Sequence, residues 1–273
     1  LHLWIRRQRQ MCIRDRDQVA QEVGSNVKMV QDYYAAFGFE DYSFRLSLWD
    51  PEKTEKYIDQ PENWKKSEDR LRQIMDDLGV DYTESVGEAA FYGPKVDIQF
   101  KTALGREESM STIQLDFAAK ERFGLSYMDE NGNQNDEVLV IHRAPLSTHE
   151  RFVAFLTEHW MGNFPTWISP TQVQIITISE RHSDYAGEVA SRLKEHKVRV
   201  TVDDSDSTIG RKIRTHRKMR PAYMLIIGDG EAADGTVSIR ARNGDQRNGV
   251  PLEDFIVGVT EEINNRSLSL IHI

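Results

Sequence analysis

The sequence predicts two domains of different class, an antiparallel-sheet α+β domain over residues 17–165 and then an α/β domain of about 100 residues. Three observations support this prediction. The length of 273 residues suits two domains that each bury a core. Neighbouring strand-like segments backed by helices fill the first part, whereas strands and helices alternate in the second. Pro165 and Pro170 separate the two patterns as a short linker.

Hydrophobic periodicity indicates the elements of the first domain. Apolar residues at steps of three and four predict helices that end near Gly38 and Gly79, because glycine is a common helix terminator. Alternating or continuous apolar residues predict strands. The predicted helices span 17–37, 64–78 and 148–161, and the predicted strands span 95–101, 111–117 and 138–141.

The second domain begins beyond Pro170. Predicted strands span 173–178, 198–202, 223–227 and 237–239, and predicted helices span 183–196, 208–219 and 251–264. Because helices separate the first three strands, we expect parallel pairing between them. The two ends, residues 1–16 and 268–273, match neither pattern and are interpreted as tails, or as sequence that does not belong to the natural gene product.

Composition excludes several classes of protein. A single Cys excludes a disulfide framework, and the absence of an apolar run of about 18 residues argues against a membrane span, so we expect a cytoplasmic protein. The net charge of −9 at first opposes a nucleic-acid partner. Its distribution is uneven, however, because the segment from Arg211 to Arg220 holds six basic residues and no acid. This segment is either an ordinary solvated helix face or a phosphate-binding face.

The segment from Val138 to Phe152 is the most informative for chemistry. Its strand ends at His142, where a rigid platform could hold a metal ligand, and Arg151 lies in the first turn of the next helix, where it could bind polyphosphate. The alternative is a structural histidine and a surface arginine. A zinc hydrolase using His142 and His149 is weakly supported, because no HExxH arrangement is present.

Two further polar residues stand out on predicted strands. Lys95 follows the turn FYGP and could pair with a phosphate or carboxylate, or could be a solvated residue of an edge strand. Gln114 lies among apolar residues, and its amide needs hydrogen bonds from a ligand or from the protein. Each of these signals is weak when taken alone.

Taken together and in order, the motifs resemble the threonyl-tRNA synthetase family. The similarity covers about residues 17–266, and its motifs are AFYGPKVDIQF, STIQLDF, VIHRAPLSTHERF, FPTWISPTQV, TIGRKIRTHRKMRPAYMLIIGD and VSIRAR. The resemblance implies the C-terminal part of a class II aminoacyl-tRNA synthetase catalytic domain over 17–167 and a mixed-sheet α/β anticodon-binding domain over 168–267. The intact enzyme of this family is a ligase of protein biosynthesis that activates threonine with ATP and Mg²⁺ and transfers it to tRNA(Thr).

The resemblance also assigns roles to individual residues. It makes His142 a ligand of a catalytic zinc ion that holds threonine, and Arg151 the catalytic arginine that binds ATP. Further positions fall into three groups. Tyr92 and Gln114 line the threonine pocket, Lys95 and Thr148 lie near ATP, and Thr177, Arg211, Lys212 and Arg214 belong to the anticodon-binding face.

Departures from the family pattern limit what this chain could do alone. The family's first two motifs and two further zinc ligands should precede residue 17 and are not found, and one histidine cannot hold a tetrahedral zinc ion. We therefore expect the isolated chain to be inactive and the homodimer to be a property of the intact enzyme. The alternative is a non-enzymatic RNA-binding module that uses only the C-terminal domain.

Overall fold

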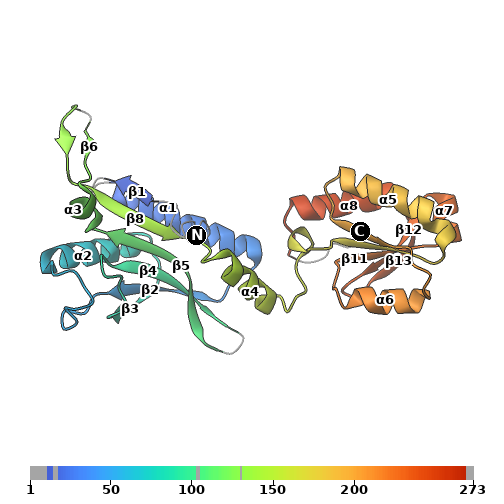
Figure 1. Ribbon diagram of the computed structural model, residues 1–273, viewed down its shortest axis with the longest axis horizontal. Coiled ribbons are helices and arrows are strands. Elements are labelled where there is room, and N and C mark those ends of the chain that lie inside the picture. Colours follow the sequence, from blue (N-terminus) through green and yellow to red (C-terminus); the bar gives the residue numbers. More distant parts are fainter. Residues whose placement is uncertain (1–10, 15–17, 103–104, 130, 269–273) are drawn as a thin grey trace. The chain divides into compact units, whose positions relative to one another are not determined.

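The chain folds into two compact units, residues Leu1–Phe155 and Leu156–Ile273 (Figure 1). The structure is a computed structural model, and it describes residues 11–14, 18–102, 105–129 and 131–268. The division between the units falls before the linker that the sequence predicts around Pro165 and Pro170. The linker therefore belongs to the second unit, where Gln172 and Arg199 donate hydrogen bonds to the carbonyls of Thr166 and Ser169.

The first unit is built on a six-stranded sheet. In spatial order its strands are β1 (Met11–Arg14), β8 (Leu139–Ala144), β5 (Glu107–Asp116), β4 (Lys95–Lys101), β2 (Tyr42–Leu48) and β3 (Tyr82–Val86). All neighbours pair antiparallel except β2 and β3, which are parallel. The predicted antiparallel α+β architecture is therefore confirmed.

Helices cover one face of this sheet. α1 (Val19–Phe37) and α2 (Pro61–Asp77) pack on the face that carries Val96, Ile113 and Ile141, all buried. Two more helices, α3 (Ala119–Phe123) and α4 (His149–His159), follow β5 and β8, and a hairpin of β6 (Tyr127–Met128) and β7 (Gln134–Asn135) lies between α3 and β8 in the chain. The opposite face of the sheet carries polar side chains and is the subject of the next subsection.

Three strands of this sheet differ from the sequence prediction. The segment 1–16 is predicted to be a tail, yet β1 pairs with β8 as an edge strand, because β8 offers a row of backbone groups that need partners. β2 and β3 fall in segments where no strand is predicted, and β3 is a mostly exposed edge strand. The predicted tail at 268–273 lies outside the described residues except for Leu268.

The second unit is a five-stranded mixed sheet. Its strands are ordered β10 (Val200–Asp203), β9 (Val173–Thr177), β11 (Tyr223–Ile227), β12 (Thr236–Ala241) and β13 (Gln246–Pro251). β9 pairs in parallel with both neighbours, as predicted, and the other pairs are antiparallel. α5 (Ser183–Glu195) and α8 (Leu252–Asn264) cover one face, and α6 (Ile209–Arg217) lies on the other (Figure 1). The short α7 (Asp229–Asp234) follows β11, and η2 (Thr166–Ile168) and η3 (Glu180–His182) flank β9.

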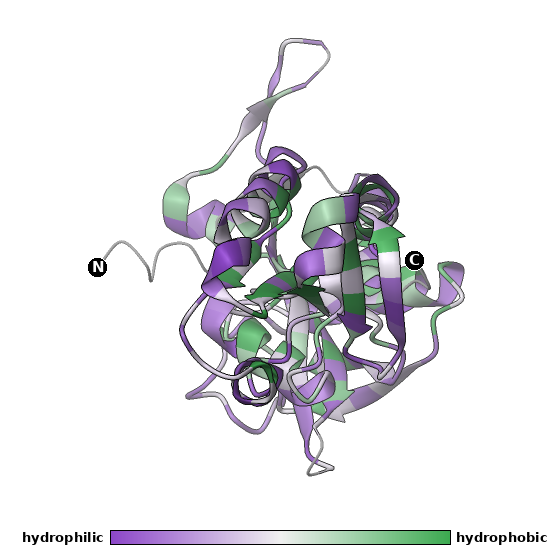
Figure 2. Cartoon of the chain, turned by 90° about the vertical axis from the view of Figure 1, so that its right-hand side faces the viewer, coloured by the Kyte–Doolittle hydropathy of each residue, from purple (hydrophilic) through white to green (hydrophobic). Residues whose placement is uncertain are grey.

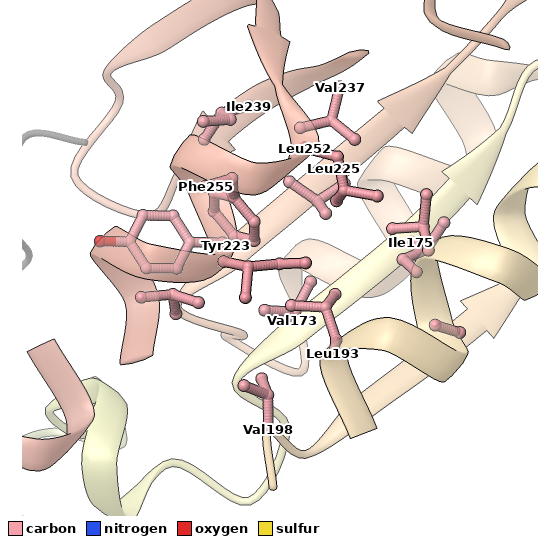
Figure 3. Close-up of a cluster of buried hydrophobic side chains, with 14 of the residues drawn as sticks. Val173, Ile175, Leu193, Val198, Tyr223, Leu225, Val237, Ile239, Leu252 and Phe255 are labelled. Atoms are coloured by element: carbon pink, nitrogen blue, oxygen red, sulfur yellow. The ribbon is translucent and has the colours of Figure 1, made fainter. Parts of the chain in front are cut away.

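The core of the second unit lies between the sheet and the pair α5 and α8. Leu193 and Phe255 project from these helices onto Val173, Leu225 and other residues of the sheet (Figure 3). The inner strands are coloured as hydrophobic, whereas the outer helix surfaces are largely hydrophilic (Figure 2). In the described part of the chain, no helix is long and apolar enough to cross a membrane.

Replacing Phe255 by Ala should destabilise the second unit strongly. Phe255 is fully buried, and the centroid of its ring lies 5.6 Å from that of Tyr223. Truncation to Ala therefore leaves a cavity in the core. We expect the free energy of unfolding to fall by about 3–5 kcal/mol in a urea titration. Val257→Ala is the matched control on the same helix, because Val257 is 55% exposed and should cost under about 1 kcal/mol. Equal losses in the two variants would contradict the described core.

Candidate functional site

The uncovered face of the first sheet carries two parallel rows of polar side chains. Strand register brings residues from different strands side by side, because side chains opposite each other on paired strands share a face. One row crosses four strands and consists of Ser47, Lys95, Gln114 and His142. The adjacent row consists of Arg45, Asp97 and Thr112. Three of the residues that the sequence singles out thus lie in one line.

Asp97 is the centre of this face. Its carboxylate is fully buried and accepts hydrogen bonds from Lys95 Nζ at 2.7 Å, Ser47 Oγ at 2.8 Å and Thr112 Oγ1 at 2.8 Å. Arg45 Nη2 lies 3.3 Å from the same carboxylate. A buried carboxylate is tolerated only with such partners, so Asp97 holds the Lys95 ammonium in place at the face.

The turn before β4 sets Tyr92 over the same row. The Tyr92 hydroxyl donates a hydrogen bond to Gln114 Oε1, and its ring lies 5.3 Å from the His142 ring. Gly93 allows this turn to approach β5, because a Cβ at this position would lie 1.8 Å from the Leu115 carbonyl oxygen. Tyr92, Lys95, Gln114 and His142 therefore form one cluster, which we call the polar cluster.

His142 has one ring nitrogen bonded and one buried. Its Nε2 lies 2.9 Å from Asp116 Oδ2, and Asp116 is itself held by backbone N–H groups of Ala118 and Ala119. The Nδ1 atom is buried without a hydrogen-bond partner in the structure. In many metal sites a carboxylate bonds one ring nitrogen of a histidine and so orients the other nitrogen toward the metal. His142 has this arrangement, because Asp116 bonds Nε2 and Nδ1 has no protein partner.

Thr148 and Arg151 form a separate pair at the start of α4. The backbone N–H of Arg151 lies 3.4 Å from Thr148 Oγ1, and the Arg151 guanidinium pairs with Glu108 at 2.6 Å. Glu108 and Gln114 are six residues apart on β5, which corresponds to about 20 Å. The polar cluster and the pair of Thr148 and Arg151 thus lie toward opposite ends of β5.

A complete zinc site is not formed by the described residues. Within residues 11–14, 18–102, 105–129 and 131–268, no three His, Cys, Asp or Glu side chains gather where they could hold a metal ion. His142 supplies one imidazole, as the resemblance implies. The described residues therefore do not fit a protein-held zinc ion by themselves, and the zinc hydrolase interpretation receives no support.

A basic groove of about 810 Å³ opens on the second unit beside the end of α6. Its cations come from α6, from the turn before β11 and from β12 and its end, and they are Arg214, Arg217, Lys218, Arg220, Arg240 and Arg242. Among the described residues, none of the six is within ion-pair distance of a carboxylate. Burial lowers the pKa of the Arg242 guanidinium. Uncompensated cations around one groove favour a polyanionic ligand.

A second groove of about 350 Å³ shares Arg240 and Gln246 with the basic groove. Its walls include the apolar side chains of Ile178, Ile213, Ile226 and Ile239. Glu231 adds a carboxylate. Although burial raises the pKa of Glu231, hydrogen bonds from Ser238 Oγ and the Gly228 N–H outweigh that effect, and the pKa is lowered. An apolar slot with a fixed acceptor suits an unstacked base next to a bound backbone.

Two of the predicted anticodon-binding residues, Lys212 and Thr177, have buried side chains. Lys212 is only 2% exposed, and its ammonium donates to the Thr177 carbonyl at 3.0 Å and lies 3.3 Å from the carbonyl of Asp203. Thr177 is fully buried at the end of β9. These two side chains anchor α6 to the sheet, so we do not retain them as direct RNA contacts. Arg211 and Arg214 are exposed, and Arg214 lines the basic groove.

Sequence reasoning missed Asp97 and the groove residues Arg240 and Arg242. The alternation over Lys95–Lys101 predicts a half-buried strand with polar residues facing solvent, yet Asp97 is fully buried. The available signal was the repetition of polar residues on the same face of two strands, at Lys95 and Asp97 and at Thr112 and Gln114. Arg240 on β12 and Arg242 just after it belong to the motif VSIRAR, but sequence reasoning assigned them no role, because only the fold brings them beside α6.

Two protein families match this chain. The family described as tRNA synthetase class II core domain (G, H, P, S and T) matches residues 5–160, and the family described as anticodon binding domain matches residues 172–262. A threonine–tRNA ligase of Bacillus velezensis is 49% identical over 241 residues, which cover 88% of this chain and 37% of that protein. A threonine–tRNA ligase of Staphylococcus aureus is 47% identical over 248 residues, covering 90% of this chain and 38% of that protein. The chain thus spans less than two fifths of these relatives.

Solved structures have the same architecture. The RNA binding domain of threonyl-tRNA synthetase from Cryptosporidium parvum matches with a TM-score of 0.83 and 33% identity, covering 92% of this chain and 62% of that one. A putative threonyl-tRNA synthetase from Aeropyrum pernix matches with a TM-score of 0.74 at 24% identity, covering 96% and 64% of the two chains, and supports the fold alone.

Replacing Gly93 by Ala should disrupt the polar cluster and lower stability. The added Cβ cannot lie 1.8 Å from the Leu115 carbonyl oxygen, so the turn carrying Tyr92 must move. We expect the first unit to lose about 1–3 kcal/mol of unfolding free energy, measured by urea titration. Gly187→Ala is the matched control, because its Cβ would meet open space on α5 and should be neutral or stabilising. Equal stability of the two variants would contradict the close approach.

Proposed function

Because the chain belongs to the class II tRNA synthetase core family and is homologous to threonine–tRNA ligases, we propose that it is a part of an enzyme that activates threonine with ATP and transfers it to tRNA(Thr). The observation that supports this most is the polar cluster, which gathers three predicted threonine-binding residues and one predicted ATP-binding residue. ATP with Mg²⁺, tRNA(Thr), a homodimer and a cytoplasmic location belong to the same proposal.

Threonine would bind at the polar cluster. Gln114 and Tyr92 offer an amide and a hydroxyl, and His142 offers a buried ring nitrogen, groups that can recognise the amino and hydroxyl groups of an amino acid. A site built to bond a substrate hydroxyl rejects an analogue that lacks it, because its polar groups would then remain unpaired. We propose that this chemistry selects threonine over valine. A zinc ion at His142 would need further ligands beyond those described.

ATP would lie along β5 between the polar cluster and α4. Lys95 offers an ammonium at one end and Arg151 a guanidinium at the other, and both can stabilise negative charge on phosphate oxygens. Arg151 pairs with exposed Glu108 at 2.6 Å, so binding of ATP requires this arginine to exchange one anionic partner for another. Because an exposed ion pair contributes little to stability, breaking the pair with Glu108 costs little free energy.

The second unit would bind the anticodon region of tRNA(Thr). Its basic groove can neutralise phosphates while the adjacent apolar groove receives a base, whose amino groups can donate to Glu231. Arg211 and Arg214 stay in this proposal as groups that contact RNA directly, joined by Arg217. The non-enzymatic alternative uses this unit alone, and the basic groove is the observation behind it.

Arg151→Ala should abolish most of the threonine-dependent ATP–pyrophosphate exchange of an assembled enzyme. We expect no exchange by this chain alone and exchange after assembly with the rest of a threonine–tRNA ligase relative. Loss of a charge-stabilising arginine should then lower the exchange rate about 10²–10³-fold. Arg106→Ala, an exposed arginine near Glu107, is the control and should keep the rate. A soluble assembled complex without exchange would favour the non-enzymatic alternative.

The double variant Arg214→Ala/Arg217→Ala should bind a tRNA(Thr) transcript more weakly. Removing two phosphate-facing cations should also reduce the slope of log affinity against log salt by about 2. The control is Arg192→Ala/Lys194→Ala, which removes the same charge from α5 on the opposite face of the sheet. Equal losses in the two double variants, measured by fluorescence anisotropy at several salt concentrations, would remove the basic groove from the proposal.

A further inference from the structure

The segment 161–169, which we call the latched segment, is held to the rest of the second unit through its backbone carbonyls. Arg220 donates to the carbonyl of Met161, and Arg242 donates to those of Asn163 at 3.2 Å and Phe164 at 2.7 Å. On the other side, Arg199 donates to the carbonyls of Trp167 and Ser169, each at 2.9 Å. Guanidinium groups that bond backbone carbonyls keep their full positive charge, because a carbonyl is a neutral acceptor.

Two of these arginines also line the basic groove. Arg220 and Arg242 are among the groove cations, and Asn163 of the latched segment is itself part of the groove wall. The Arg242 guanidinium bonds the Arg220 carbonyl at 3.1 Å, so the two residues are linked to each other as well. Arg220 has a left-handed φ of 52°, which is unfavourable for a residue with a side chain and is offset by such contacts. The latched segment therefore determines where two groove charges lie.

We infer that the latched segment and the basic groove are coupled, so that RNA binds more tightly when the segment is latched and the segment is more stably latched when RNA is bound. This inference rests on the proposed binding of RNA in the groove. A phosphate gains from two guanidinium groups that are already held in place, because less side-chain freedom is then lost on binding. Linkage makes the effect reciprocal, since RNA must raise the stability of the latched form by the same factor.

Arg199 allows this coupling to be tested without altering the groove. It holds the latched segment at Trp167 and Ser169 but is not one of the groove residues. A change at Arg199 therefore removes the bonds to Trp167 and Ser169 and leaves every groove cation present. Arg199→Lys keeps the charge but cannot reproduce the forked guanidinium contacts, and Arg199→Gln also removes the charge.

The experiment measures binding of a fluorescein-labelled tRNA(Thr) transcript to the full chain, together with hydrogen exchange of the amides in residues 161–169. We expect about fivefold weaker binding for Arg199→Gln and at least about threefold for Arg199→Lys, within the usual range of coupling between sites. Lys194→Gln on α5 is the charge-matched control and should change binding less than twofold. In the wild-type chain, RNA should slow exchange in 161–169, and both Arg199 variants should exchange faster without RNA.

The possible results separate the coupling from the proposed function. Arg199 variants that exchange faster in 161–169 yet bind RNA like Lys194→Gln would overturn the coupling and leave RNA binding intact. Unchanged exchange in both variants would contradict the latch itself. A wild-type chain that does not bind the transcript would contradict the proposed RNA binding and, with it, this inference. If Arg199→Gln unfolds in a thermal melt, Arg199→Lys decides the matter, because it retains the charge and most of the side-chain volume.

Discussion

A carboxylate without access to water is the constraint on which the first unit depends. Asp97 is stable there only because side chains from β2, β4 and β5 supply its hydrogen bonds, so three strands must keep their register for one charge to be satisfied. The same contacts fix Lys95 beside Gln114 and His142. Stability and site geometry are therefore set by one group on a face that the helices leave uncovered.

The second unit has a buried carboxylate as well, because Glu262 is fully buried and accepts a hydrogen bond from the Tyr223 hydroxyl, but several of its cations are held by neutral acceptors. Lys212, Arg242 and Arg199 are satisfied by backbone carbonyls rather than by carboxylates. These bonds fasten α6 and the latched segment to the sheet while leaving positive charge uncancelled. Each unit thus buries one apolar sheet face under a pair of helices, with the buried carboxylate of Asp97 on the other face of the first sheet and the basic groove beside α6 in the second unit.

Sequence predicted most of the elements that bury apolar surface, but it missed β2, which buries Phe44, Leu46 and Leu48. The confirmed helices and strands have clear periodicity, whereas the edge strands β3 and β13 are held mainly by backbone hydrogen bonds and have little hydrophobic pattern. For the site, Lys95, Gln114 and His142 were singled out from their places on predicted strands, and Tyr92 was added by the resemblance to the family. The direct RNA role of Lys212 could not be judged from sequence, because a basic run does not reveal which of its members points inward.

The basic groove has a consequence for how an RNA would arrive. Residues 17–170 have a net charge of −13, whereas the groove on the second unit has six cations in one place. An approaching polyanion is repelled by the first and attracted by the second, so its orientation is selected during diffusion, before any contact forms. Attraction to the groove should speed productive association at low salt, whereas repulsion by the acidic residues suppresses other encounters, and both effects weaken as ions screen the charges.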